Sequence, residues 1–106
     1  MKIRLITLLL LCVFSMAFAQ ERRQIINCTF NGVRLYGRVQ VVTHNADFRV
    51  RVVNSMPDLR VKRVNSLPNR CGMWQFVDSN PDFTIQFVEN APDFTIEFVE
   101  SQPGRR

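Results

Sequence analysis

The sequence is poor in the residues that carry catalysis and metal binding. It has one histidine and three cysteines among 106 residues, and no two cysteines have the C-x-x-C spacing. The G-x-S-x-G pattern of many hydrolases is also absent. His44 lies beside Asn45 in a predicted surface turn, and no motif places a serine or cysteine near it. These absences argue against an enzyme, a redox protein and a bound metal or cofactor.

Long apolar runs are missing from most of the chain, and one short run stands near the start. Lys2 and Arg4 precede it, and Ala17-Phe18-Ala19 has the A-x-A pattern of a cleavage site. Residues 1–19 are therefore predicted to be a signal peptide cut after Ala19, which leaves a secreted or periplasmic chain of residues 20–106. The apolar run is too short to span a bilayer, so we expect no membrane anchor.

The small number of cysteines allows their pairing to be predicted. Cys12 belongs to the predicted signal peptide, and the mature chain keeps only Cys28 and Cys71. A chain of this length forms one small domain with a thin hydrophobic core. In an oxidising compartment the two cysteines can pair only with each other. The chain-entropy model gives such a disulfide a stabilisation of about 4 kcal/mol.

Positive charge is missing from one half of the chain and concentrated in the other. Residues 71–101, the acidic half, contain six Asp or Glu and no Lys or Arg. Residues 37–70, the basic half, contain seven Lys or Arg and two Asp. An exposed basic surface on this half would bind anionic polysaccharide or lipid, and its candidate residues are Arg49, Arg51, Arg60, Lys62 and Arg63. Export argues against nucleic acid as the partner.

An eleven-residue repeat runs through both halves. Residues 81–90 and 92–101 share the pattern Pro-Asp-Phe-Thr-Ile-x-Phe-Val, and residues 46–55 and 57–66 are earlier copies with the same spacing. Two degenerate copies carry glycine at the first core position, as Gly37 and Gly72. A fixed period indicates one structural unit laid down repeatedly.

Each repeat alternates apolar and polar residues with a period of two, which predicts a short β-strand with one buried face. Phe83, Ile85 and Phe87 point one way, and the residues between them point the other way. The pattern predicts an all-β domain of about six strands, each about six residues long, joined by turns of about four. Asn31-Gly32 also predicts a small hairpin before the repeats.

The apolar faces need a cover, and two arrangements provide one. A flat meander would seek another copy, whereas two intertwined halves bury the face within one chain. The charge split favours the second arrangement, because basic strands placed between acidic ones avoid like-charge neighbours. We therefore expect strands of the basic half to neighbour strands of the acidic half, and we expect a monomer.

The repeated aspartates and the aromatic residues allow more than one interpretation. Asp47, Asp58, Asp82 and Asp93 recur at one repeat position. They are expected to form turns, and a calcium-binding ladder is the alternative, although the glycine-rich turns of such ladders are missing. Trp74 and Tyr36 occupy core-patterned positions, so packing is favoured over a carbohydrate-binding platform.

The repeats also resemble a known family. Leu35-Tyr36-Gly37, the V-N-S copies, Cys71-Gly72-Met73-Trp74-Gln75-Phe76-Val77 and the two Pro-Asp-Phe-Thr-Ile-x-Phe-Val units closely resemble the septoil knot family of small secreted bacterial proteins. The resemblance implies that the two halves wind around each other in a seven-crossing torus knot. It brings no established activity. The sequence thus predicts a stable, non-enzymatic structural or interaction module, and the binder of anionic polysaccharide or lipid is the alternative.

Overall fold

The computed structural model describes residues 24–105, which contain nine β-strands and no helix. The predicted signal peptide lies outside the described residues. The short strands β1 (Thr29–Phe30) and β2 (Val33–Arg34) form the predicted hairpin around Asn31-Gly32. The repeat strands are β3 (Gly37–Val41), β4 (Phe48–Val52), β5 (Leu59–Arg63), β6 (Met73–Phe76), β7 (Phe83–Phe87) and β8 (Phe94–Phe98). A last strand, β9 (Gly104–Arg105), pairs antiparallel with β5.

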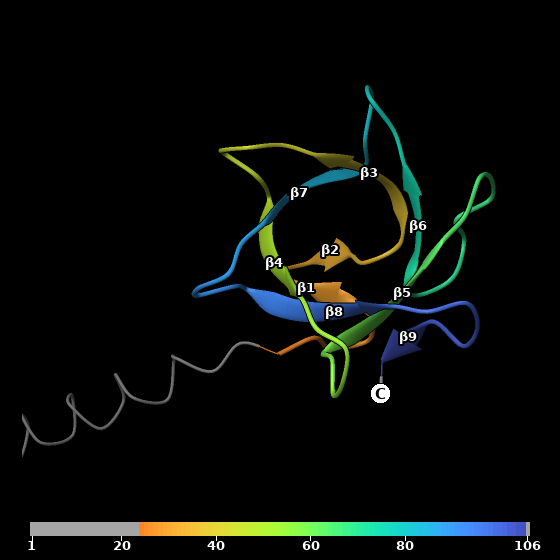
Figure 1. Ribbon diagram of the computed structural model, residues 1–106. Coiled ribbons are helices and arrows are strands. Elements are labelled where there is room, and N and C mark those ends of the chain that lie inside the picture. Colours follow the sequence, from red (N-terminus) through yellow and green to blue (C-terminus); the bar gives the residue numbers. More distant parts are fainter. Residues whose placement is uncertain (1–23, 106) are drawn as a thin grey trace, which may run out of the picture.

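The six repeat strands form a closed parallel barrel in which the two halves of the chain alternate. Their order is β6-β3-β7-β4-β8-β5, and β5 pairs in turn with β6. Every neighbour of a strand from the basic half within this ring comes from the acidic half. Figure 1 looks along the barrel and shows the strands as a ring with the connecting turns reaching outward. The predicted interleaving of the two halves is confirmed.

The register explains how parallel strands can follow each other with short connections. A connection between two parallel strands usually needs about a dozen residues, because the chain must run back along the sheet to the level where the first strand began. Here Val41, the last residue of β3, pairs with Ile85, and Ile85 pairs with Phe48, the first residue of β4. Strand β4 therefore begins at the level where β3 ends. Six residues suffice for the link, where the repeats predicted about four, and the strands have four or five residues instead of six.

The inward side chains form three layers across the barrel. The first layer is Phe48, Leu59, Phe83 and Phe94, with Gly37 and Gly72 at the two equivalent repeat positions without a side chain; the second is Val39, Val50, Val61, Trp74, Ile85 and Ile96; the third is Val41, Val52, Arg63, Phe76, Phe87 and Phe98. All six side chains of the second layer are fully buried. Trp74 is the largest side chain of this layer, and its Nε1 donates a hydrogen bond to the Leu35 carbonyl at 3.0 Å. Side chains therefore fill the middle of the barrel.

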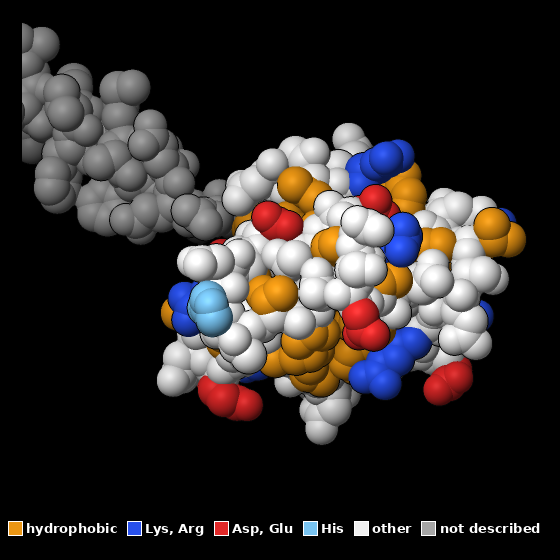
Figure 2. Space-filling model, turned by 90° about the horizontal axis from the view of Figure 1, so that it is seen from above, with side chains coloured by type: hydrophobic (Ala, Val, Ile, Leu, Met, Phe, Trp, Pro, Cys, Tyr) orange, Lys and Arg blue, Asp and Glu red, His pale blue; other side chains and the backbone are white. Residues whose placement is uncertain are grey.

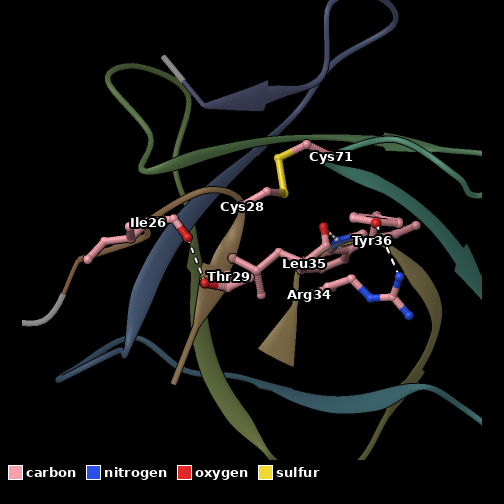
Figure 3. Close-up of a disulfide and its surroundings, with 8 residues drawn as sticks. Ile26, Cys28, Thr29, Arg34, Leu35, Tyr36 and Cys71 are labelled. Carbon is pink, nitrogen blue, oxygen red and sulfur yellow. Dashed lines mark hydrogen bonds between the residues drawn. A yellow bond between two sulfur atoms is a disulfide. The ribbon is translucent and has the colours of Figure 1, made fainter. Parts of the chain in front are cut away.

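The hairpin closes the end of the barrel where the strands begin. Phe30, at the end of β1, places its ring 5.6 Å from that of Phe48 and 5.4 Å from that of Phe94, measured between centroids. The disulfide between Cys28 and Cys71 ties this hairpin to the connector before β6, with the two Cα atoms 5.8 Å apart (Figure 3). The predicted pairing of these cysteines is present in the structure.

Glycine at position 72 is required by the crowding around the disulfide connector. Its φ is +82°, and an added Cβ would overlap the Arg60 carbonyl and the Gly104 amide nitrogen. Gly72 also donates its N–H to the Leu35 carbonyl at 3.1 Å. The degenerate repeat that begins at Gly72 therefore marks the place where the hairpin, the connector and β9 meet.

The recurrent aspartates join the two halves instead of closing their own turns. Asp82 Oδ2 accepts the Arg38 N–H at 2.8 Å, and Asp58 Oδ2 accepts the Thr95 N–H at 2.8 Å. Asp93 and Asp47 repeat these two patterns with Arg49 and Thr84, so each bond spans 37 or 44 residues. We call these four contacts the aspartate clasps. All four aspartates lie in bends before their strands, as expected, but the stagger of the strands presents each carboxylate to an amide of the other half.

Candidate functional site

The end of the barrel where the strands stop has no plug among the described residues, and its third layer is partly exposed. Val41, Val52 and Phe87 keep 47%, 48% and 43% of their surface accessible. Phe76 and Phe98 are half-buried. The alternation predicted these side chains to point inward, and they do, but nothing in residues 24–105 covers them. Figure 2 views the barrel from the side and shows hydrophobic side chains gathered along its lower edge, next to Lys or Arg. We call this surface the open end.

One cation belongs to the open end. Arg63 continues the inward alternation of Leu59 and Val61, so it occupies a third-layer position where the five other repeat strands have Val or Phe. Its guanidinium carbon lies 4.1 Å from the ring centroid of Phe98 and 5.6 Å from that of Phe76. Such contacts contribute roughly 0.5–1 kcal/mol at an exposed site. The two rings therefore favour a position of the guanidinium at the mouth of the barrel.

A hollow of about 470 Å³ lies beside this arginine. Its lining contains four apolar side chains, one amide and the guanidinium: Val41, Val64, Phe76, Phe87, Asn65 and Arg63. Ligand sites typically have this make-up, with a mostly apolar wall and a few polar groups that fix orientation. The hollow stops at the filled second layer, so a ligand would lie across the open end and would not enter the barrel.

The other four predicted anion-binding residues lie on the outer surface. Arg49 and Arg51 belong to β4, and Arg60 and Lys62 belong to β5. Strand β8 separates the two pairs, and it places Thr95 beside Arg51 and Glu97 beside Arg60. The five cations thus do not form one patch, because the interleaving that joins the halves also dilutes the basic charge. Arg63 faces the open end, and it also lines a second hollow together with Lys62.

The remaining candidates from the sequence have structural surroundings. His44 is exposed in the link after β3, where its Nδ1 lies 3.1 Å from Thr43 Oγ1. Trp74 is fully buried, as its core pattern predicted. Tyr36 is half-buried at the closed end, and the Arg34 guanidinium carbon lies 5.4 Å from its ring centroid (Figure 3). Within residues 24–105, no three His, Cys, Asp or Glu side chains are grouped to hold a metal ion.

Sequence reasoning missed the open end, although one signal for it was present. The alternation in β5 places a cation at Arg63, in a column that is otherwise apolar. A lone cation in such a column indicates a barrel end that contacts solvent, since a charge in the filled layers would lack a partner. The exposure of Phe87 could not be read from its pattern, which is the same as that of the buried Phe83.

The fold defines a class of proteins with a closed, all-parallel barrel in which the two halves of one chain alternate strand by strand. No helix among the described residues has the length and apolar character needed to cross a bilayer. Residues 32–106 match the family described as the 7(1) septoil knot domain, and the chain belongs to this family. No curated protein is similar enough to the chain to be matched.

Proposed function

We propose that the protein is a non-enzymatic, exported interaction module whose contact surface is the open end. The observation that supports this proposal most is the exposed third layer, which sits on two layers of tightly packed side chains. A rigid base below an exposed apolar ring keeps the contact residues in place without a partner, so little ordering is needed on binding. The cross-link between Cys28 and Cys71 is compatible with life in an oxidising compartment.

Binding, without a chemical step, also fits the positions of the reactive residues. His44 is exposed, no acidic side chain within residues 24–105 is buried, and both described cysteines are consumed by the disulfide. The four recurrent aspartates are occupied in the clasps between the halves. Within the described residues, the cysteines and the recurrent aspartates, which could otherwise contribute to an active site, therefore have structural roles.

Complementation of a deletion strain tests the proposal. His44→Ala should restore any phenotype of the strain as well as the wild type does, because it removes only an exposed turn residue. Phe87→Ser should fail to restore it at equal protein abundance, because it replaces an exposed apolar contact by a polar one. Loss of function in a folded His44→Ala variant would contradict a non-enzymatic role. Full function of Phe87→Ser would contradict the open end as the contact surface.

Binding of anionic polysaccharide or lipid through the basic repeats is the second candidate. Four exposed or half-exposed cations on β4 and β5 favour it, whereas Glu97 between the two pairs weakens it. Retention on a sulfated polysaccharide column distinguishes the candidates. Arg51→Gln combined with Lys62→Gln should elute at much lower salt if this surface binds, and near the wild-type position if the open end is the contact surface.

A further inference from the structure

The open end combines an apolar ring with one cation that lacks an acidic partner in the part of the chain that the structure describes. Within residues 24–105 the Arg63 guanidinium has contacts with two aromatic rings and no hydrogen bond or ion pair. Glu100 lines a neighbouring hollow together with Arg63, yet the two form no ion pair. Guanidinium carries five N–H donors in one plane. The aromatic contact with Phe98 uses none of these donors, so among residues 24–105 they remain available to a ligand.

The repeat gives an independent reason to assign Arg63 a binding role. The equivalent positions in the other strands carry Val41, Val52, Phe76, Phe87 and Phe98, and the last two belong to the best conserved repeats within this chain. A Val or Phe at position 63 would extend the apolar ring without a charge. An arginine there instead adds a fixed cation at the rim of an apolar hollow of about 470 Å³.

We propose that the open end binds an apolar molecule that carries one terminal carboxylate, of the fatty-acid type. The argument is charge complementarity: the apolar lining accepts the hydrocarbon chain, and the Arg63 fork matches the two oxygens of a carboxylate. Asn65, on the rim of the same hollow, adds an amide that can donate a second hydrogen bond. This inference rests on the proposed function, because it names the ligand class of the same surface.

Calorimetric titration of the intact domain with dodecanoate, below its micelle concentration, tests the inference, with dodecanol as the uncharged probe. Dodecanoate should bind about tenfold more tightly than dodecanol, since a charge-assisted bidentate contact adds to equal hydrocarbon burial. Arg63→Gln should abolish this preference and leave dodecanol binding unchanged. Arg63→Lys should keep part of it, because charge remains while the planar fork is lost.

Arg60→Gln on the outer face of the same strand is the matched control and should bind both probes as the wild type does. Equal binding of dodecanoate and dodecanol, or an Arg63→Gln variant that keeps the preference, would overturn the carboxylate assignment. Tighter binding of a hydrophobic tripeptide with a free C-terminus than of dodecanoate would also overturn it, in favour of a peptide ligand. Because each of these results can occur while Phe87→Ser still fails in complementation, failure of the ligand class is distinguishable from failure of the proposed function.

Discussion

The basic half and the acidic half differ in composition but are equivalent in position. The basic half contributes β3, β4 and β5, with Val39, Val50 and Val61 in the middle layer. The acidic half contributes Trp74, Ile85 and Ile96 to the same layer. Each strand of one half lies between strands of the other. The comparison teaches that neither half is a folding unit, because the partners of every barrel strand are supplied by the other half.

The arrangement of the two halves mainly keeps like charges apart and pairs few opposite charges. Of the outer cations whose strand partners the register defines, Arg38 faces Gln75, Arg49 faces Gln86 and Arg51 faces Thr95. Only Arg60 faces an acid, Glu97. The acidic residues stand mostly in the links and clasps. The expectation that opposite charges favour interleaving holds in a weaker form: neutral strands keep like charges apart.

Separation of the halves should have the largest effect. A fragment of residues 20–66 and a fragment of residues 70–106 are each expected to be unfolded, because their strands would have no hydrogen-bonding neighbours and an exposed core face. Circular dichroism and the dispersion of amide signals in nuclear magnetic resonance measure this. A well-dispersed spectrum from either fragment alone would mean that one half folds without the other.

Refolding should be slow compared with other small β-proteins. All-β domains with distant contacts refold in about milliseconds to seconds. Here each strand must find two neighbours from the other half, and the family resemblance adds a threading step, so we expect a slower main phase. Stopped-flow and manual-mixing fluorescence of Trp74, the one tryptophan of the chain, measure the rate. A fast, single-phase recovery would argue against threading.

Removal of the disulfide should have the next largest effect on stability. Cys28→Ser with Cys71→Ser opens a loop that spans 43 residues and links the hairpin to the start of the acidic half. The chain-entropy model predicts a loss of about 4 kcal/mol in the free energy of unfolding. Urea unfolding of the double variant and of the wild type measures it. A loss below about 1 kcal/mol would show that the unfolded chain is little affected by the cross-link.

The aspartate clasps should differ in strength between the halves. Asp58, from the basic half, accepts both the N–H and the Oγ–H of Thr95, whereas Asp82, from the acidic half, accepts only the Arg38 N–H. We expect Asp58→Ala to cost about 2 kcal/mol and Asp82→Ala about 1 kcal/mol, since each bond to a charged acceptor adds to stability. Urea unfolding gives both values.

Thr95→Val is the matched control for this comparison, because it removes the hydroxyl and keeps the backbone amide. In that background Asp58→Ala should cost no more than Asp82→Ala does in the wild type. Equal costs for the two single aspartate variants would contradict the asymmetry of the clasps.

Removal of outer cations should have the smallest effect. Arg60→Gln loses an opposite charge on the neighbouring strand and should cost about 0.5 kcal/mol, whereas Arg51→Gln, which faces Thr95, should cost about 0 kcal/mol. The difference should shrink at high salt, where exposed pairs are screened. Thermal unfolding at two salt concentrations measures both variants. A larger loss of stability in Arg51→Gln than in Arg60→Gln would show that the charge of the residue on the neighbouring strand is unimportant here.

The sequence by itself determined the strands, the inward columns and the cysteine pair. Local physics suffices for these features: alternation with a period of two assigns faces, the eleven-residue period assigns links, and two cysteines in a chain that is expected to be exported can pair in only one way. It also predicted that the halves interleave, through the charge split. Phe83, Ile85 and Trp74 are buried as their pattern indicates.

Only the tertiary structure decided what the repeats do at their ends. The stagger between neighbouring strands brings Asp58 to Thr95 and Asp82 to Arg38, and no local pattern specifies partners so far apart in the chain. Phe83 and Phe87 both point inward, but they lie at opposite ends of β7. Phe83 is buried because the hairpin closes its end of the barrel, and Phe87 is exposed because nothing in residues 24–105 closes the other end. Arg63 lies beside two aromatic rings at the open end. A charged side chain can occupy an inward position there because that end of the barrel is in contact with solvent.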